Sequence, residues 1–206
     1  MSRPERFTAE RSTGETRVHV DVEPVPAGEE REAADVRVDW NDHGGLDEPV
    51  DPAGATHLVE TLLRYARLSG TVEATGDLAH HVVEDLGITL GAALAPLAEA
   101  EIARFADRTV PMDEALVQAA LDLGGRAHHE TDLDEVAPLA DHVARSLALN
   151  ANATLHLRVL RDGMRHHVAE AATKALGLCL REAMRPSADV ESTKGHVEWG
   201  TPEEDG

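Results

Sequence analysis

The chain has a single cysteine and very few aromatic side chains, and each shortage excludes a class of protein. Cys179 cannot form an internal disulfide framework by itself, which argues against a small secreted scaffold and fits a reducing compartment. It lies in an apolar run, so a buried, unreactive thiol is expected. Aromatic residues make up only 2% of the chain, and the core must therefore be built mainly from Leu, Val, Ile and Ala.

Basic side chains are also scarce. Lys and Arg number 19 against 39 Asp and Glu, which gives a formal net charge of −20. This charge repels the phosphates of nucleic acids and the headgroups of anionic membranes, so neither is expected as a partner. The sequence shows no signal-peptide pattern and no apolar run of about 18 residues, and we expect a soluble cytoplasmic protein.

Hydrophobic periodicity predicts strands and helices in two halves that follow a similar order. The predicted elements are strands at 15–23, 36–40 and from 71, helices at 54–68 and 79–100, a helix at 139–149, a strand at 154–160 and a helix at 165–184. Residues 115–123 fit either a strand or a short helix. Glycines and a proline weaken the regularity of the helix at 79–100.

Both long helices open with the pattern His-His-x-x-Glu, at 80–84 and at 166–170. The two pairs lie 86 residues apart (166 − 80), and a single histidine precedes each of them. His57 lies 23 residues before the first pair, and His142 lies 24 residues before the second. A duplicated half-domain explains this repeat better than chance does.

The repeat of the whole arrangement, leading histidine included, favours metal binding, whereas one such pattern alone would favour a solvated histidine face. Adjacent histidines are separated by about 100° around a helix, so they are predicted to serve two different ions. The glutamate three and four residues later shares a face with both. The candidate ligands are His57, His80, His81, Glu84, His142, His166, His167 and Glu170. They divide into two sets of three histidines and one glutamate, which suits Mn²⁺, Fe²⁺ or Zn²⁺.

A third histidine pair has no such context. His128 and His129 are followed directly by Glu130, without the spacing of the other pairs and without a leading histidine. We interpret this pair as surface residues.

The order and spacing of several short motifs resemble the imidazoleglycerol-phosphate dehydratase family, lyases of histidine biosynthesis. The motifs are RSTGET at 11–16, GDL at 76–78, HHVVED at 80–85, PMDEAL at 111–116, DLGGR at 122–126, HHVAEA at 166–171 and STKG at 192–195. The resemblance implies an α+β fold of two duplicated half-domains, each a mostly antiparallel sheet with helices on one face. We place these half-domains at residues 9–100 and 101–195, before an acidic tail at 196–206.

The resemblance also implies a reaction and a site. Water is removed from imidazole glycerol phosphate to give imidazole acetol phosphate, with two Mn²⁺ ions per site on the eight candidate ligands. The implied substrate contacts are Glu15, Arg104, Arg126, Lys174, Ser192, Thr193 and Lys194. Their cationic and hydroxyl groups suit a phosphate monoester. The family forms a homo-oligomeric shell of many subunits, and its sites are shared between chains.

The carboxylates are given distinct roles. Glu15 is predicted to act as an acid/base group, with Glu84 and Glu170 as metal ligands first. A surface ion pair of Glu15 with Arg11 or Arg17 is the alternative.

Several positions depart from the family pattern. Thr56 and Tyr65 stand where the family has an acidic residue and a second histidine, and the loop before His80 is about three residues short, with Ala79 where an Asp is expected. Changes in residues that support metal ligands cost about 10–100-fold in affinity or activity. Two alternatives therefore stay open: a diverged paralogue that acts on another small phosphorylated substrate, and a non-catalytic scaffold assembled by metal.

Overall fold

The computed structural model describes residues 1–42 and 52–187, which form two half-domains with the same order of elements. The first contains β1 (Phe7–Ser12), β2 (Thr16–Pro24), β3 (Asp35–Asp42), α1 (Pro52–Ala66), β4 (Leu68–Leu78), α2 (Ala79–Leu94) and the 3₁₀ helix η1 (Ala95–Glu99). The second contains β5 (Phe105–Met112), β6 (Ala115–Asp122), β7 (His128–Thr131), α3 (Pro138–Asn150), β8 (Thr154–Arg161) and α4 (Arg165–Ala183).

Each half-domain builds one four-stranded sheet, and the two sheets have the same topology. The strand orders are β1-β2-β4-β3 and β5-β6-β8-β7. Two of the three pairings in each sheet are antiparallel, whereas β3 runs parallel to β4 and β7 runs parallel to β8. The predicted fold class, α+β with two duplicated and mostly antiparallel half-domains, is confirmed.

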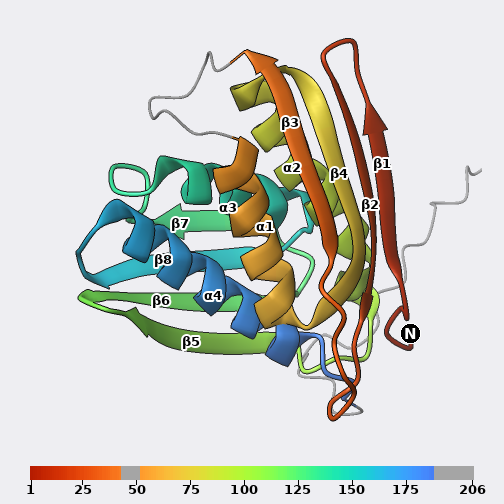
Figure 1. Cartoon of the computed structure of the whole chain (residues 1–206). Coiled ribbons are helices and arrows are strands. Elements are labelled where there is room, and N and C mark those ends of the chain that lie inside the picture. The colour runs from red at the N-terminus through yellow and green to blue at the C-terminus, as the bar shows by residue number, and fades with distance from the viewer. Residues whose placement is uncertain (43–51, 188–206) are drawn as a thin grey trace, which may run out of the picture.

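The four helices lie between the two sheets. Helices α1 and α2 pack on the first sheet, α3 and α4 pack on the second, and the layers meet where α1 contacts α4 and α2 contacts α3. In Figure 1 the strands of the first sheet run vertically at the right, and those of the second run across the lower left. Each helix pair therefore joins residues of one half-domain to residues of the other.

The core is aliphatic, as the shortage of aromatic residues predicts. In β2 the alternate residues Val18, Val20 and Val22 are at most 2% exposed, because successive side chains of a strand point to opposite faces. Cys179 is fully buried in α4, and burial raises the pKa of its thiol to about 12. The prediction of a buried thiol is confirmed.

Three strands, β1, β5 and β7, have no counterpart among the predicted elements. All three are edge strands, and none of them shows the regular burial of alternate residues seen in β2. An edge strand needs little apolar alternation, since it contacts only one neighbour. Phe7, in β1, is only 1% exposed although it lies before the predicted start of the first half-domain at residue 9. For residues 115–123, where a strand and a short helix were both possible, the structure shows the strand β6.

Two further predictions need correction. The helix predicted at 79–100 ends at Leu94 and continues as 3₁₀ turns, because Pro96 cannot donate the next backbone hydrogen bond. The surface interpretation is wrong for His129, whose side chain is 5% exposed and whose Nε2 lies 2.8 Å from Asp141 Oδ1 of α3. His128 is 55% exposed, as expected.

The stretch Ala79–Glu99 is long and apolar enough to cross a membrane by length and composition alone. However, 61% of its most apolar window is buried inside the protein, where α2 lies between the first sheet and α3. These features are those of a core helix.

Glycines inside α2 and α4 allow the helix pairs to approach closely. A Cβ added at Gly91 would collide with Leu147, Asn150 and the Ala151 backbone at the end of α3. A Cβ added at Gly177 would collide with Leu62, Tyr65 and Ala66 of α1. The glycines lie 86 residues apart, and their three contacts are each 85 apart (147 − 62, 150 − 65, 151 − 66). The same close contact is therefore made twice.

This contact predicts the sign of a stability change. In a free helix, Gly→Ala stabilises by about 1 kcal/mol, but Gly91→Ala and Gly177→Ala should instead lower the free energy of unfolding by about 1–3 kcal/mol because they overpack a backbone contact. Chemical denaturation measures this change. Ala92→Ser, at the exposed neighbouring position, is the control and should change stability by less than about 0.5 kcal/mol. Stabilisation by either glycine substitution would contradict the close contact.

Candidate metal centres

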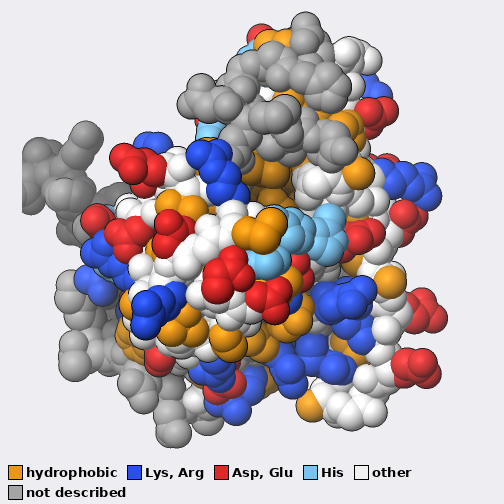
Figure 2. Space-filling model, turned by 60° about the vertical axis from the view of Figure 1, so that its left-hand side comes forward, with side chains coloured by type: hydrophobic (Ala, Val, Ile, Leu, Met, Phe, Trp, Pro, Cys, Tyr) orange, Lys and Arg blue, Asp and Glu red, His pale blue; other side chains and the backbone are white. Residues whose placement is uncertain are grey.

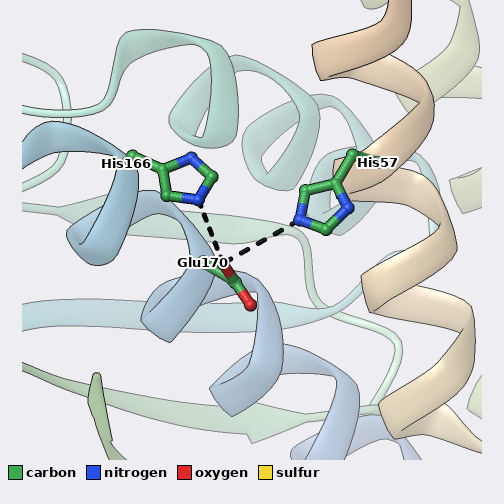
Figure 3. A group of neighbouring side chains, drawn as sticks. All are labelled: His57, His166 and Glu170. Carbon is green, nitrogen blue, oxygen red and sulfur yellow. Dashed lines mark ion pairs between the residues drawn. The ribbon is translucent and has the colours of Figure 1, made fainter. Parts of the chain in front are cut away.

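The seam between α1 and α4 brings one histidine of the first half-domain to a histidine and a glutamate of the second. His166 Nε2 lies 3.2 Å from Glu170 Oε2, and His57 Nε2 lies 3.8 Å from the same oxygen. The two imidazole rings stack with centroids 6.1 Å apart. Figure 3 shows both rings directed at the carboxylate from separate helices. We call this group, His57, His166 and Glu170, the α1–α4 triad.

The seam between α2 and α3 repeats the arrangement with the half-domains exchanged. His80 Nε2 lies 3.7 Å from Glu84 Oε2, and the ring of His142 lies 4.9 Å from that of His80. In each group the three ligand atoms lie within 4.8 Å of one another. We call His80, Glu84 and His142 the α2–α3 triad. Figure 2 shows histidine side chains gathered in the middle of one exposed face.

His142 supplies the clearest sign that the α2–α3 triad fits a cation. Its Nε2 is buried and has no hydrogen-bond partner in the described part of the chain. Burial, reinforced by the nearby charge of His80, lowers the pKa of His142, so its imidazole favours the neutral form that binds metals. A buried polar atom without a partner costs about 1–3 kcal/mol, and coordination of a metal would remove that cost.

The remaining two candidate histidines point away from the triads. His80 and His81 have ring centroids 6.0 Å apart with planes inclined at 64°, and His166 and His167 repeat this geometry at 6.0 Å and 61°. Each triad thus holds two histidines and one glutamate of the predicted set of three histidines and one glutamate. His81 and His167, which we call the divergent histidines, lie in two separate acidic groups.

His81 is held by carboxylates near the start of β2 and the end of β4. Its Nδ1 lies 3.0 Å from Asp77 Oδ1 and 3.6 Å from Glu15 Oε2. The hydrogen bond with Asp77 raises the pKa of His81 and lowers that of Asp77. Because Nδ1–H of the neutral ring donates to a carboxylate, Nε2 keeps its lone pair for a cation.

His167 has the corresponding environment in the second half-domain. Its Nδ1 lies 3.0 Å from Glu114 Oε2, and its Nε2 lies 3.5 Å from Asp113 Oδ2. Glu114 also accepts the backbone N–H of Met164 at 2.6 Å, and such backbone hydrogen bonds lower its pKa to about 2. Glu114 therefore stays ionised and fixes both the ring and the start of α4.

The turn that carries Glu15 is fixed by a buried carboxylate. Asp85 accepts Arg11 Nε at 2.7 Å and also accepts the hydroxyl of Thr16. Thr16 in turn contacts Thr13 across the turn. Arg11 is therefore paired with Asp85 and not with Glu15, whose side chain is 60% exposed beside His81. The alternative of an Arg11–Glu15 pair is wrong.

Among the described residues, the predicted phosphate contacts Arg104 and Lys174 lie at different ends of α4. Arg104 makes a two-pronged pair with Asp122, at 2.6 and 3.0 Å, and its backbone N–H donates to Ala183 at the end of α4. Lys174 lies nine residues before Ala183, about 14 Å along the helix. Arg126 is exposed, and its carbonyl accepts the Thr154 hydroxyl. Ser192, Thr193 and Lys194, and the predicted tail at 196–206, lie outside the described residues.

Lys174 lies beside the α1–α4 triad. Its Nζ lies 2.8 Å from Glu170 Oε1, and this contact is the main cause of the lowered pKa of Glu170. The same Nζ lies 5.7 Å from the centroid of the Tyr65 ring. Tyr65, where the resemblance implies a histidine, therefore lies beside the lysine that pairs with Glu170.

Sequence reasoning missed three residues that hold the divergent histidines, namely Asp77, Asp113 and Glu114. Asp77 is the last residue but one of β4 and precedes α2, so the helical spacing rule did not mark it, although it lies within the GDL motif at 76–78. Glu114 is remote in sequence from His167, so only the motif at 111–116 marked it.

The fold and these groups define a class: a duplicated α+β protein with two His–Glu triads, each made from both half-domains. The model of the family "Imidazoleglycerol-phosphate dehydratase" matches residues 54–180. The dehydratase of Pyrobaculum aerophilum is 47% identical over 154 residues, covering 68% of this chain and 82% of its own. That of Caldivirga maquilingensis is 36% identical over 206 residues, covering 93% and 98%.

Solved structures agree. The crystal structure of IGPD from Pyrococcus furiosus in complex with (S)-C348 has a TM-score of 0.73 at 30% identity, covering 91% of this chain and 99% of its own. The Staphylococcus aureus enzyme shares the fold, with a TM-score of 0.64 at 21% identity. The chain belongs to the imidazoleglycerol-phosphate dehydratase family, the lyases that catalyse a dehydration in histidine biosynthesis.

The carboxylates beside the divergent histidines predict that metal affinity changes even when no candidate metal ligand is substituted. If His81 ligates Mn²⁺, Asp77→Asn should weaken Mn²⁺ binding by about 10–100-fold, because His81 loses the charged acceptor that fixes its ring. Equilibrium dialysis against Mn²⁺ measures this change. Glu73→Gln removes an exposed carboxylate of the same strand, which pairs with Arg37, and should leave the affinity unchanged. Equal Mn²⁺ affinity in Asp77→Asn and wild type would contradict the role of Asp77.

Proposed function

We propose that this dehydratase is a metal enzyme that removes water from imidazole glycerol phosphate to give imidazole acetol phosphate, in the cytoplasm. Two divalent cations per site, Mn²⁺ first with Fe²⁺ or Zn²⁺ as substitutes, would be held by the triads. The observation that carries the proposal is that two separate triads each place two imidazoles and one carboxylate within 4.8 Å. That donor set suits these metals and leaves coordination positions open for substrate.

We further propose that His81 and His167 complete the triads of neighbouring copies in a homo-oligomer. Each triad offers three ligands, whereas the two divergent histidines sit in acidic groups of their own. A histidine next to a triad member on the same helix is turned about 100° away from it, so it serves a different centre. Each chain would thus give His81 and His167 to triads of neighbouring copies and would receive one histidine in each of its own two triads. Such reciprocal contacts support a closed shell of many subunits.

The chain's own residues suggest how the substrate is handled. When bound, the cations would act as Lewis acids toward the imidazole ring and a hydroxyl of the substrate. Glu15 would move the proton that must leave a carbon of the substrate, and its exposure and its distance of 3.6 Å from His81 Nδ1 support this role. Lys174, Arg104 and Arg126 would bind the phosphate, and we propose that different copies of the chain contribute them to one site.

The backbone and the neighbours of Arg104 restrict the position of its guanidinium. Its backbone is in the left-handed region, at φ 69°, and a Cβ at Gly124 would collide with its guanidinium. Asp122 holds the guanidinium on one side. The planar group is therefore preorganised, which lowers the entropy lost when it binds an oxyanion.

Ligand removal tests the proposal directly. Chelation should abolish dehydration of imidazole glycerol phosphate, and Mn²⁺ should restore it. His81→Ala and Glu170→Ala should each lower kcat/KM by at least about 100-fold, because each removes a metal ligand. His128→Ala, an exposed histidine outside the triads, is the matched control and should keep full activity.

Equal activity in His81→Ala, Glu170→Ala and wild type would contradict the mechanism. An assembled, Mn²⁺-loaded protein without any dehydration would favour the scaffold alternative. Turnover of a different phosphorylated substrate in its place would favour the paralogue.

A further inference from the structure

A cavity of about 730 Å³ lies at the junction of the two half-domains, at the ends of α1 and α4 that are remote from the α1–α4 triad. Its walls come from the start of the chain, the segment after β2, the end of α1, β5 and the end of α4. From Glu170 to Leu178, the first residue of α4 in the lining, the distance along the helix is about 12 Å, and no residue of the candidate metal centres lines the cavity. Its size falls in the range of small-molecule sites, about 300–1,000 Å³.

The charge of this cavity is opposite to that of the protein. Acidic residues outnumber basic ones by 39 to 19 in the chain, yet the lining contains five arginines and one glutamate. The charged lining residues are Arg3, Arg67, Arg108, Arg181, Arg185 and Glu182. Their formal charge is +4, and such a concentration of one sign in a hollow attracts anions.

Ion pairs within the protein neutralise only part of this positive charge. Glu182 pairs with Arg108 at 3.1 Å and also with Arg185. Arg67 donates to three backbone carbonyls, including Pro26 O at 2.7 Å, and Arg3 donates to Met184 O at 3.5 Å. Carbonyl acceptors carry no net charge, so these bonds position the guanidiniums without neutralising them.

The negative ends of two helix dipoles offset a further part of the positive charge in the cavity. The α1 and α4 helices both end at this cavity, and each contributes about −0.5 charge there. Together they offset about one of the four excess positive charges. Arg181 makes no hydrogen bond or ion pair with any residue in the described ranges. A positive excess of about three remains for a ligand.

The uncharged walls are apolar. Val25, Leu178 and Met184 line the cavity together with three prolines and two alanines. A ligand that satisfies both kinds of wall carries a multiply charged anionic group and an apolar body. Arginine pairs with phosphate through two parallel hydrogen bonds, which favours a phosphate group at this density of guanidiniums.

We propose that this cavity is a binding site for a small organic phosphate of nucleotide size. The guanidiniums of Arg181, Arg185 and Arg67 hold the phosphate, and Val25, Leu178 and Met184 contact the apolar body. Because the site spans the ends of α1 and α4, its ligand contacts both half-domains at once.

Isothermal titration calorimetry of the assembled, full-length protein tests the proposal with three probes. Adenosine 5′-monophosphate should bind once per chain, inorganic phosphate should bind more weakly, and adenosine should not bind. Binding should weaken as salt rises from low to high concentration, because the attraction is electrostatic. Arg181→Gln should weaken binding of the monophosphate by at least about tenfold, since it removes charge-assisted hydrogen bonds.

Matched variants distinguish binding in this cavity from binding at surface arginines and at the candidate metal centres. Arg158→Gln, which removes an exposed arginine of β8 paired with Asp132, should leave binding unchanged. Lys174→Gln, which removes a proposed substrate contact, should also leave it unchanged. The proposal is overturned if neither the monophosphate nor phosphate binds at millimolar concentration, if Arg181→Gln and Arg158→Gln bind equally, or if only Lys174→Gln loses binding. A change in oligomer size in Arg181→Gln with unaltered binding would assign the cavity to subunit contact and also overturn it.

Discussion

The close contact between α1 and α4, repeated between α2 and α3, is the constraint on which both candidate metal centres depend. Gly177 and Gly91 remove the Cβ atoms that would hold these helices apart. Each pair joins one half-domain to the other, so each triad takes one histidine from one half and a histidine and a glutamate from the other. Neither half-domain contains a complete triad. The duplication therefore creates the sites only when its two products pack face to face.

Carboxylates support the second histidine of each pair, His81 and His167. Asp77 lies four residues before His81, and its carboxylate contacts Nδ1 at 3.0 Å. In the second half-domain Glu114 makes the corresponding contact from a different element, the turn before β6. Glu15, directly before β2, holds the position equivalent to Glu114 and lies 3.6 Å from His81 Nδ1, so both halves place a glutamate beside this histidine and Asp77 adds a second carboxylate in the first half.

The sequence was sufficient wherever the determining geometry is local. A helix places residues i and i+4 together, so the His80–Glu84 and His166–Glu170 pairs follow from spacing alone, and the separation of adjacent histidines follows from the same rule. The union of His57 with His166 is different, because it depends on how two sheets pack their helices. The pairing of Arg104 with Asp122, and the burial of His129 against Asp141, likewise depend on tertiary contacts. The edge strands were missed because one-sided pairing leaves little pattern in the residues.

The sharing of ligands between copies is the central claim, and subunit mixing tests it most directly. His81→Ala keeps both triads and His167 but gives no His81 to its neighbours, whereas Glu170→Ala keeps His81 but lacks the α1–α4 triad. When the two inactive variants are dissociated, mixed and reassembled with Mn²⁺, some sites should combine an intact triad from one chain with His81 from the other. The account predicts that a measurable fraction of wild-type dehydratase activity returns on mixing and that neither variant recovers alone. Mixed assemblies that form but stay inactive would contradict it.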